Sequence, residues 1–235
     1  MVPALARSRA AARIVQCSMT LRGIVGESLS WGGSRNDRWP NAWDYPNLIV
    51  EPPDLANLAG ENYVVGFGYT AQVGVWQGPF VENGWVPFAV DRSKTCPEFK
   101  APPDGEPGGL SGAWRSYLYS IAMVTHPQAW EPQNEGLPVD RRWRSTARLS
   151  DVRFPSNKSV FFERAARHDN RLAVWEQGAG TCNVVFADAH VHKVRPSDAV
   201  RAMRYETGWP SDDPPGDAPI PFNSTPEGVW GRDVR

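Results

Sequence analysis

The residues best suited to metal chemistry stand close together near position 190. Asp188, His190 and His192 follow one another at two-residue spacing, and His168 lies upstream of them. Side chains of an extended strand repeat their direction every second residue, so both imidazoles would project from one side. Such a pair holds Zn²⁺ when a third ligand converges on it. The spacing therefore predicts either a metal-dependent enzyme at His190 and His192 or, as the alternative, a surface strand whose histidines are solvated or cover an aromatic side chain.

A second set of candidate ligands lies in a proline-rich loop near the C-terminus. Asp212, Asp213 and Asp217 carry the oxygen donors that Ca²⁺ prefers, although the regular D-x-D-x-D-G spacing of a calcium loop is absent. The favoured prediction is therefore a chain without a cofactor, and Ca²⁺ bound in this loop is the alternative. The sequence contains no G-x-S-x-G, no H-E-x-x-H and no glycine-rich phosphate loop. No catalytic residue is predicted, and the favoured interpretation is a non-enzymatic protein.

Eleven tryptophans raise a third class of function, because an exposed indole can stack on a sugar ring or on a partner protein. Four lie in or beside expected strands and are predicted to be in the core: Trp76, Trp85, Trp114 and Trp175. Three lie in expected loops and are predicted to be exposed: Trp130, Trp143 and Trp209. A surface module that binds glycans or proteins through exposed tryptophan is therefore an alternative function.

Composition narrows the class of protein further. The net charge of -1 does not favour nucleic acid, whose phosphates call for a clustered basic surface. The 22 prolines and 21 glycines predict many turns and long irregular loops around one domain. No apolar run approaches the roughly 20 residues that span a bilayer, so the chain as written is expected to be soluble. Its three cysteines fit either one disulfide with one buried thiol or three buried thiols.

Periodicity predicts a long N-terminal helix from Ala4 to about residue 29. Ile14, Cys17, Leu21 and Ile24 recur at three- and four-residue spacing, so they form one apolar face that packs on the rest of the protein. The stripe begins late, which predicts that the first turns project beyond the globular body. The run Trp31-Gly-Gly-Ser34 is a strong helix stop.

Strands are predicted near 63–76, 117–123 and 159–163, followed by a β-hairpin over 183–194. In the hairpin, Val184 and Phe186 lie on one face and a two-residue turn is formed by Asp188 and Ala189. Ala189 would adopt a left-handed turn conformation only at a cost of about 1 kcal/mol. Either the turn is of a type that does not need a left-handed residue at position 189, or the hairpin carries some backbone strain.

Four stretches carry a resemblance to prepilin-type cleavage/methylation proteins with a C-terminal H-x9-DG domain, such as the bacterial type II secretion pseudopilin G. Pro3-Ala-Leu-Ala-Arg-Ser-Arg-Ala-Ala-Ala-Arg13 resembles the segment that follows the family's membrane helix, and Arg35-Asn-Asp-Arg-Trp-Pro40 resembles its D-N-x-G-x-W-P. The hairpin, with Asn183, Phe186, Asp188, Ala189 and His190, is similar to F-A-D-G-H-V, but the signature His is Gly178 and the signature Gly is Ala189. The tail Pro221-Phe-Asn-Ser-Thr-Pro-Glu-Gly-Val-Trp-Gly-Arg-Asp-Val234 resembles P-x-x-x-T-P-x-G-V-R-G-R-D-F.

The resemblance implies an α+β, pilin-like fold in which a long N-terminal helix packs on an antiparallel β-sheet with Pro/Gly-rich loops. Residues 1–33 would be the C-terminal half of the pilin helix, lacking its leader and apolar half, and 34–235 the globular domain. It also makes Cys17 and Cys96 a candidate disulfide pair. The implied function is a structural subunit of a type IV pilus-like or type II secretion-like assembly. Its partners would be other subunits, contacted through the helix face of Ile14, Cys17, Leu21 and Ile24. The protein would lie at the periplasmic or extracellular face of the cell envelope. It would be anchored to the inner membrane only through the missing segment.

Overall fold

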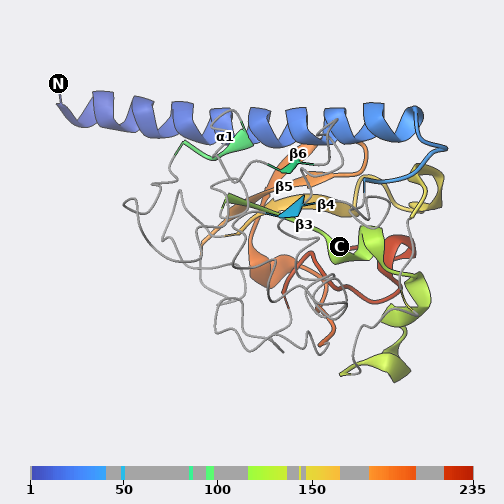
Figure 1. Cartoon of the computed structure of the whole chain (residues 1–235). Coiled ribbons are helices and arrows are strands. Elements are labelled where there is room, and N and C mark those ends of the chain that lie inside the picture. Colours follow the sequence, from blue (N-terminus) through green and yellow to red (C-terminus); the bar gives the residue numbers. More distant parts are fainter. Residues whose placement is uncertain are drawn as a thin grey trace.

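A computed structural model describes residues 2–40, 49–50, 85–86, 94–97, 116–136, 143, 147–164, 180–204 and 220–234. Helix α1 (Val2–Gly33) lies across one face of a four-stranded antiparallel sheet, as Figure 1 shows. The strands are β3 (Tyr117–Tyr119), β4 (Ser159–Glu163), β5 (Cys182–Phe186) and β6 (Val191–Val194), and they are neighbours in chain order. The fold is therefore α+β, as expected from the sequence.

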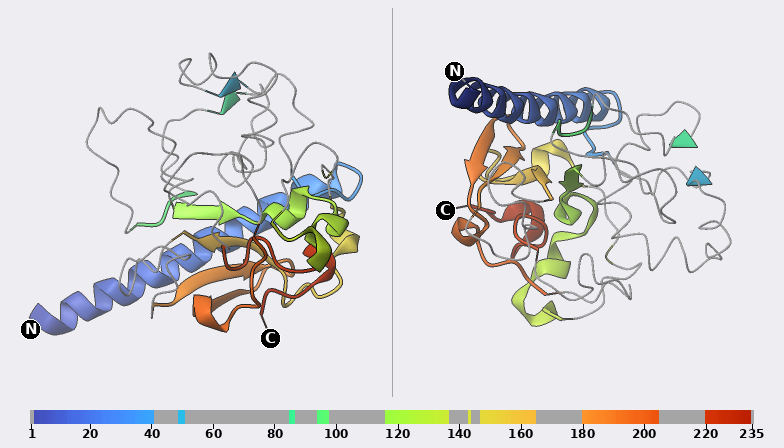
Figure 2. Two further views of the ribbon diagram at one scale, coloured as in Figure 1. Left: turned by 90° about the horizontal axis from the view of Figure 1, so that it is seen from below. Right: turned by 90° about the vertical axis from the view of Figure 1, so that its left-hand side faces the viewer.

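The two halves of α1 have different environments. Residues 4–13 are all exposed, whereas Cys17, Leu21, Ile24 and Val25 are buried against the sheet. Figure 2 shows the N-terminal turns extending past the edge of the sheet. An apolar stripe confined to the second half explains this arrangement, because only that half has a face to bury.

The C-terminal end of α1 is set by a close approach of the backbone. A Cβ on Gly32 would lie 2.5 Å from the carbonyl oxygen of Arg38, so a larger residue does not fit at this position. The chain then turns through Asn36 and Asp37, both in the left-handed region with φ of 58° and 61°. Asn and Asp tolerate that conformation better than other non-glycine residues. The predicted helix stop is confirmed.

The sheet register assigns each side chain to one of two faces. Glu163 pairs with Tyr117, and Phe161 with both Tyr119 and Val185, so these residues face α1. The Tyr117 hydroxyl donates to the Cys17 carbonyl at 3.4 Å, which ties that face to the helix. Strand residues of opposite parity lie on the other face. There Phe162 packs on Phe222, with ring centroids 5.8 Å apart.

Residues 220–234 form the third layer, opposite α1 (Figures 1 and 2). This segment has little regular structure beyond the 3₁₀ helix Gly228–Trp230, yet Phe222, Thr225, Val229 and Asp233 are buried. Ser159 Oγ lies 2.7 Å from the Phe222 carbonyl oxygen. The tail is therefore an integral part of the core.

One predicted strand needs correction and another stays untested. The strand predicted over 117–123 ends at Tyr119, and Ile121–Val124 is a fully buried 3₁₀ helix. Apolar alternation over so short a run does not distinguish a strand from a buried helical turn. The strand near 63–76 falls outside the described residues. A separate parallel pair joins β1 (Ile49–Val50) to β2 (Trp85–Val86). None of the helices in the described parts of the chain is long and apolar enough to cross a membrane.

Candidate functional site

The hairpin that joins β5 and β6 has a three-residue loop, so the two-residue turn predicted from the sequence is wrong. Phe186 N–H donates to the His190 carbonyl at 3.0 Å, and Ala189 N–H donates to the Phe186 carbonyl at 2.9 Å. Residues 187–189 therefore form the loop, and Ala189 adopts φ of 66°. A turn followed by a left-handed residue is the usual form of a three-residue hairpin, in which that position favours glycine. The strain anticipated at Ala189 is present.

Replacing Ala189 with glycine is expected to raise the free energy of unfolding by about 0.5–1 kcal/mol, because glycine adopts positive φ without a Cβ clash. Urea denaturation followed by circular dichroism measures this change. Ala187 in the same loop is the matched control, since it does not have positive φ. Ala187→Gly should lower stability through the added freedom of the unfolded chain. Equal shifts in both variants would contradict the assignment of strain to Ala189.

His190 is occupied by neighbours within its own hairpin. Its ring stacks on Phe186 with centroids 4.4 Å apart and planes 5° from parallel. Its Nδ1 lies 2.5 Å from Asp188 Oδ1, and its backbone N–H donates to the same oxygen at 3.2 Å. Partial burial raises the pKa of Asp188, but the hydrogen bonds and charge of His190 outweigh it, so this pKa lies below its ordinary value. The Asp188 contribution to stability is therefore present at neutral pH and is lost only as pH falls through the lowered pKa.

The predicted metal ligands are not gathered around one point by the described structure. The register pairs His192 with Val184, and by extension His190 with Phe186, so both histidines lie on one face as predicted. Among the described residues, however, the group of three or more His, Cys, Asp or Glu side chains with converging ligand atoms is Cys17, Cys96 and Glu163. It includes neither histidine. His168, Asp212, Asp213 and Asp217 lie outside the described residues, so the calcium prediction remains a prediction.

Trp130 is buried with 1% of its surface exposed, so its predicted place on the surface is wrong. A Cβ on Gly228 would lie 2.5 Å from Trp130 Cδ1, and the Trp130 carbonyl accepts from Glu227 N–H at 3.0 Å. The C-terminal segment thus covers the indole. Trp143 is partly buried against the core. Trp209 and the side chains of the four tryptophans predicted in the core lie outside the described residues.

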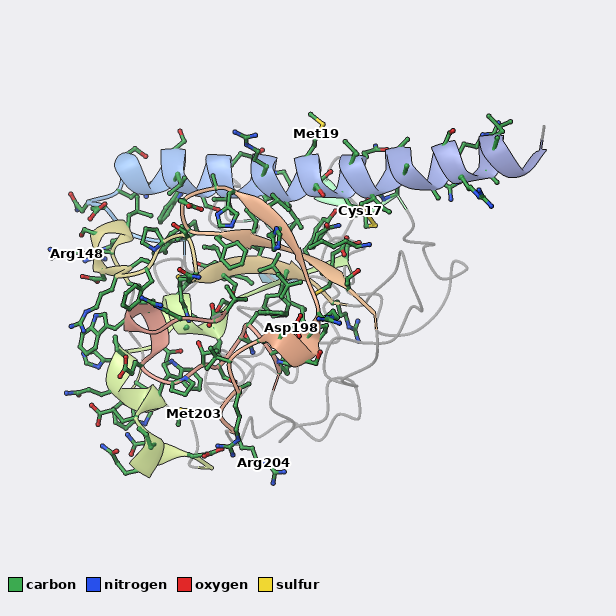
Figure 3. The ribbon with its side chains drawn as sticks, turned by 180° about the vertical axis from the view of Figure 1, so that it is seen from behind. Cys17, Met19, Arg148, Asp198, Met203 and Arg204 are labelled. Atoms are coloured by element: carbon green, nitrogen blue, oxygen red, sulfur yellow. A yellow bond between two sulfur atoms is a disulfide. The ribbon has the colours of Figure 1, made fainter. Side chains whose placement is uncertain are left out.

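The helix face predicted from periodicity packs on the sheet. Cys17, Leu21 and Ile24 are buried, and Ile14, at the edge of the contact, is partly buried. The opposite side of α1 carries Val15 and Met19, which are 58% and 69% exposed. Figure 3 shows Cys17 directed toward the sheet and Met19 directed away from it.

A disulfide links α1 to the segment 94–97 through Cys17 and Cys96, with Cα atoms 5.1 Å apart. Lys94 adds a second connection, because its Nζ lies 2.5 Å from Glu27 of the helix. The third cysteine, Cys182, is buried and unpaired with another cysteine. Desolvation, reinforced by the charge of Glu163, raises the pKa of its thiol strongly, so the reactive thiolate is disfavoured.

Glu163 is a buried carboxylate beside that disulfide, and sequence reasoning did not identify it. Its Oε2 accepts from Asn183 N–H at 2.8 Å and its Oε1 from Asn183 Nδ2 at 2.9 Å. Ser18 of α1 donates to Asn183 Oδ1 at 3.3 Å. A polar chain therefore runs from the helix through Asn183 to Glu163. The only signal in the sequence was a glutamate at the end of an apolar strand.

A buried ion pair joins β4 to the C-terminal segment, and it too was missed. Lys158 Nζ lies 2.9 Å from Asp233 Oδ1, and both side chains are fully buried. Asp233 also accepts from Ser159 N–H at 2.7 Å, from Ser159 Oγ at 2.5 Å and from Thr225 Oγ1. Lys158 donates in turn to Thr225 Oγ1 at 2.8 Å. Lys158 and Ser159 lie at the start of β4, whereas Thr225 and Asp233 belong to the C-terminal segment 220–234.

Taken together, the described residues offer two buried polar clusters, Cys17–Cys96 with Glu163 and Lys158 with Asp233, and a partly exposed helix. Comparison with known proteins adds no assignment, since no family model, no curated protein and no solved structure matches the chain.

Proposed function

We propose that this chain is a non-enzymatic structural subunit of a pilin-like or pseudopilin-like assembly, in which copies associate through α1. The main supporting observation is that the two halves of α1 differ in exposure. The second half is buried on the sheet, whereas residues 4–13 and the outer side chains Val15 and Met19 remain exposed. A helix that extends past its own domain supplies a surface for a neighbouring copy.

The chemistry of the exposed helix supports this assignment. Its first half is rich in alanine, which allows close helix-to-helix approach, and Leu5, Val15 and Met19 supply apolar area. On the inner side, the Cys17–Cys96 disulfide and the bond from Ser18 to Asn183 hold the helix on the sheet. A helix fixed on its own domain suits a subunit whose neighbours pack on that helix.

The two alternative functions have less support. A glycan-binding module needs exposed indoles, and Trp130 is covered by the C-terminal segment. A metal-dependent enzyme at His190 and His192 needs a third converging ligand, and among the described residues the group of converging ligand atoms, Cys17, Cys96 and Glu163, includes neither histidine. The pilin-like role uses instead the feature that distinguishes this fold, its long helix.

Site-specific photo-crosslinking in the cell of origin tests the proposal. Benzoylphenylalanine replaces Met19, which points away from the sheet (Figure 3), and irradiation should give a ladder of covalent multiples of this chain. Gln133 is the control position, because it is exposed on the 3₁₀ helix Pro132–Asn134, far from α1 in Figures 1 and 2. Absence of a ladder from Met19, or equal ladders from both positions, would refute self-association through the helix.

A further inference from the structure

The strongest unassigned cluster lies between α1, β4 and the segment 94–97. Cys17 and Cys96 are 0% and 1% exposed, and Glu163 is 0% exposed. One ligand atom from each residue lies within 4.8 Å of those of the other two. We propose that, once its disulfide is reduced, this cluster binds a single divalent zinc-type cation through both thiolates and the Glu163 carboxylate. The proposal is independent of the filament role.

The geometry of the cluster suits zinc. Two thiolate sulfurs bound to one tetrahedral Zn²⁺ lie about 3.8 Å apart, given Zn–S bonds of about 2.3 Å. Reduction allows the sulfurs to move to that separation by side-chain rotation, because the Cα atoms are 5.1 Å apart and each sulfur lies two bonds from its Cα. Sulfur and carboxylate oxygen are both accepted zinc donors, and three protein ligands leave one tetrahedral position open.

Neighbouring contacts keep the three ligands in place when the disulfide opens. Asn183 donates one hydrogen bond to each oxygen of Glu163, which orients the carboxylate and leaves lone pairs for a metal. Cys96 N–H donates to Ser116 Oγ at 3.2 Å, and Lys94 contacts Glu27. Cys17 sits within α1, whose second half is buried on the sheet.

The chemical steps balance without an unnamed reactant. A phosphine reductant and water convert the disulfide into two thiols and yield the phosphine oxide. The cation then displaces one proton from each thiol and binds the two thiolates with the carboxylate. A small-molecule disulfide such as oxidised glutathione would reverse the exchange: thiol–disulfide exchange re-forms the Cys17–Cys96 bond, releases the cation and yields two glutathione thiolates. The same residues would then bridge helix and sheet in either redox state.

Cobalt(II) titration under anaerobic conditions tests the site, because Co²⁺ replaces zinc and reports thiolate ligands by charge-transfer absorption. Reduced protein should bind one equivalent and oxidised protein none, and Zn²⁺ should displace the cobalt. Glu163→Gln should weaken binding at least tenfold, while Cys182→Ser should leave it unchanged. Circular dichroism and the fluorescence of buried Trp39 and Trp130 establish that each sample is folded.

The proposal would be overturned if the reduced protein, whether folded or unfolded, bound no cobalt. It would also be overturned if Glu163→Gln bound cobalt with the affinity of the wild-type protein, or if binding required Cys182. Glu163→Asp provides a second variant if Glu163→Gln fails to fold, because it keeps the charge but withdraws the oxygen by one methylene. It too should bind cobalt more weakly. As an independent readout, Zn²⁺ should raise the thermal midpoint of reduced wild-type protein and not that of reduced Cys17→Ser.

Discussion

Asp233→Asn should lower the free energy of unfolding by about 3–5 kcal/mol, because it leaves the fully buried Lys158 ammonium without its counter-charge. The substitution preserves side-chain volume, so the loss reflects charge and hydrogen bonding rather than a cavity. Urea denaturation with a two-state fit provides the measurement. The C-terminal segment should open first, because Ser159 and Thr225 also lose an ionised acceptor.

The matched control is Asp198→Asn. Asp198 accepts from Arg195 at the same N···O distance of 2.9 Å, but the two side chains are 50% and 61% exposed. Solvent screening leaves such a pair worth about 0–1 kcal/mol. A double variant in which Lys158→Met accompanies Asp233→Leu should recover part of the loss, since apolar replacements remove both buried charges. Equal effects of Asp233→Asn and Asp198→Asn would show that burial of the pair is not what stabilises the tail.

Removing the disulfide is the second large effect. Cys17→Ser with Cys96→Ser should cost about 2–4 kcal/mol, because the cross-link closes a loop with a sequence separation of 79 and so restricts the unfolded chain. The measurement is again chemical denaturation, carried out with a chelator present so that no metal substitutes for the cross-link.

Reductant supplies the control for that variant. Wild-type protein treated with a phosphine should lose a similar amount of stability, whereas the double serine variant should not respond. Cys182 cannot account for a response, because it has no cysteine partner in either protein. An unfolding free energy that is unchanged by reductant in wild-type protein would contradict a stabilising role for the disulfide.

Local patterns predicted the elements that a short window of sequence encodes. The three- and four-residue spacing of Cys17, Leu21 and Ile24 identified the helix face, and the glycine pair after Trp31 identified its end. Strand β4 was placed correctly over 159–163 and the hairpin over 183–194. The type of element and the face on which each side chain lies follow from the periodicity of apolar residues, which does not depend on distant residues.

Local patterns failed where distant packing decided the outcome. Trp130 was placed at the surface because its neighbours in sequence are polar, but a segment about a hundred residues later covers it. The turn of the hairpin was mistaken by one residue because loop length depends on how the strands register, which the residues of the loop specify only weakly. For Trp130 the deciding contact comes from the distant C-terminal segment, whereas for the hairpin it is the pairing of Phe186 with His190 inside the hairpin.

The sequence by itself determined the long helix, its apolar face, strand β4 and the β5–β6 hairpin, because these depend on the spacing of apolar residues along the chain. Only the tertiary structure decided which polar groups meet in the core. Lys158 and Asp233 are separated by 75 residues, and Glu163 reaches the Cys17–Cys96 pair only when helix and sheet are packed. Charged residues look alike in sequence whether solvated or buried, and packing alone gives each its partner.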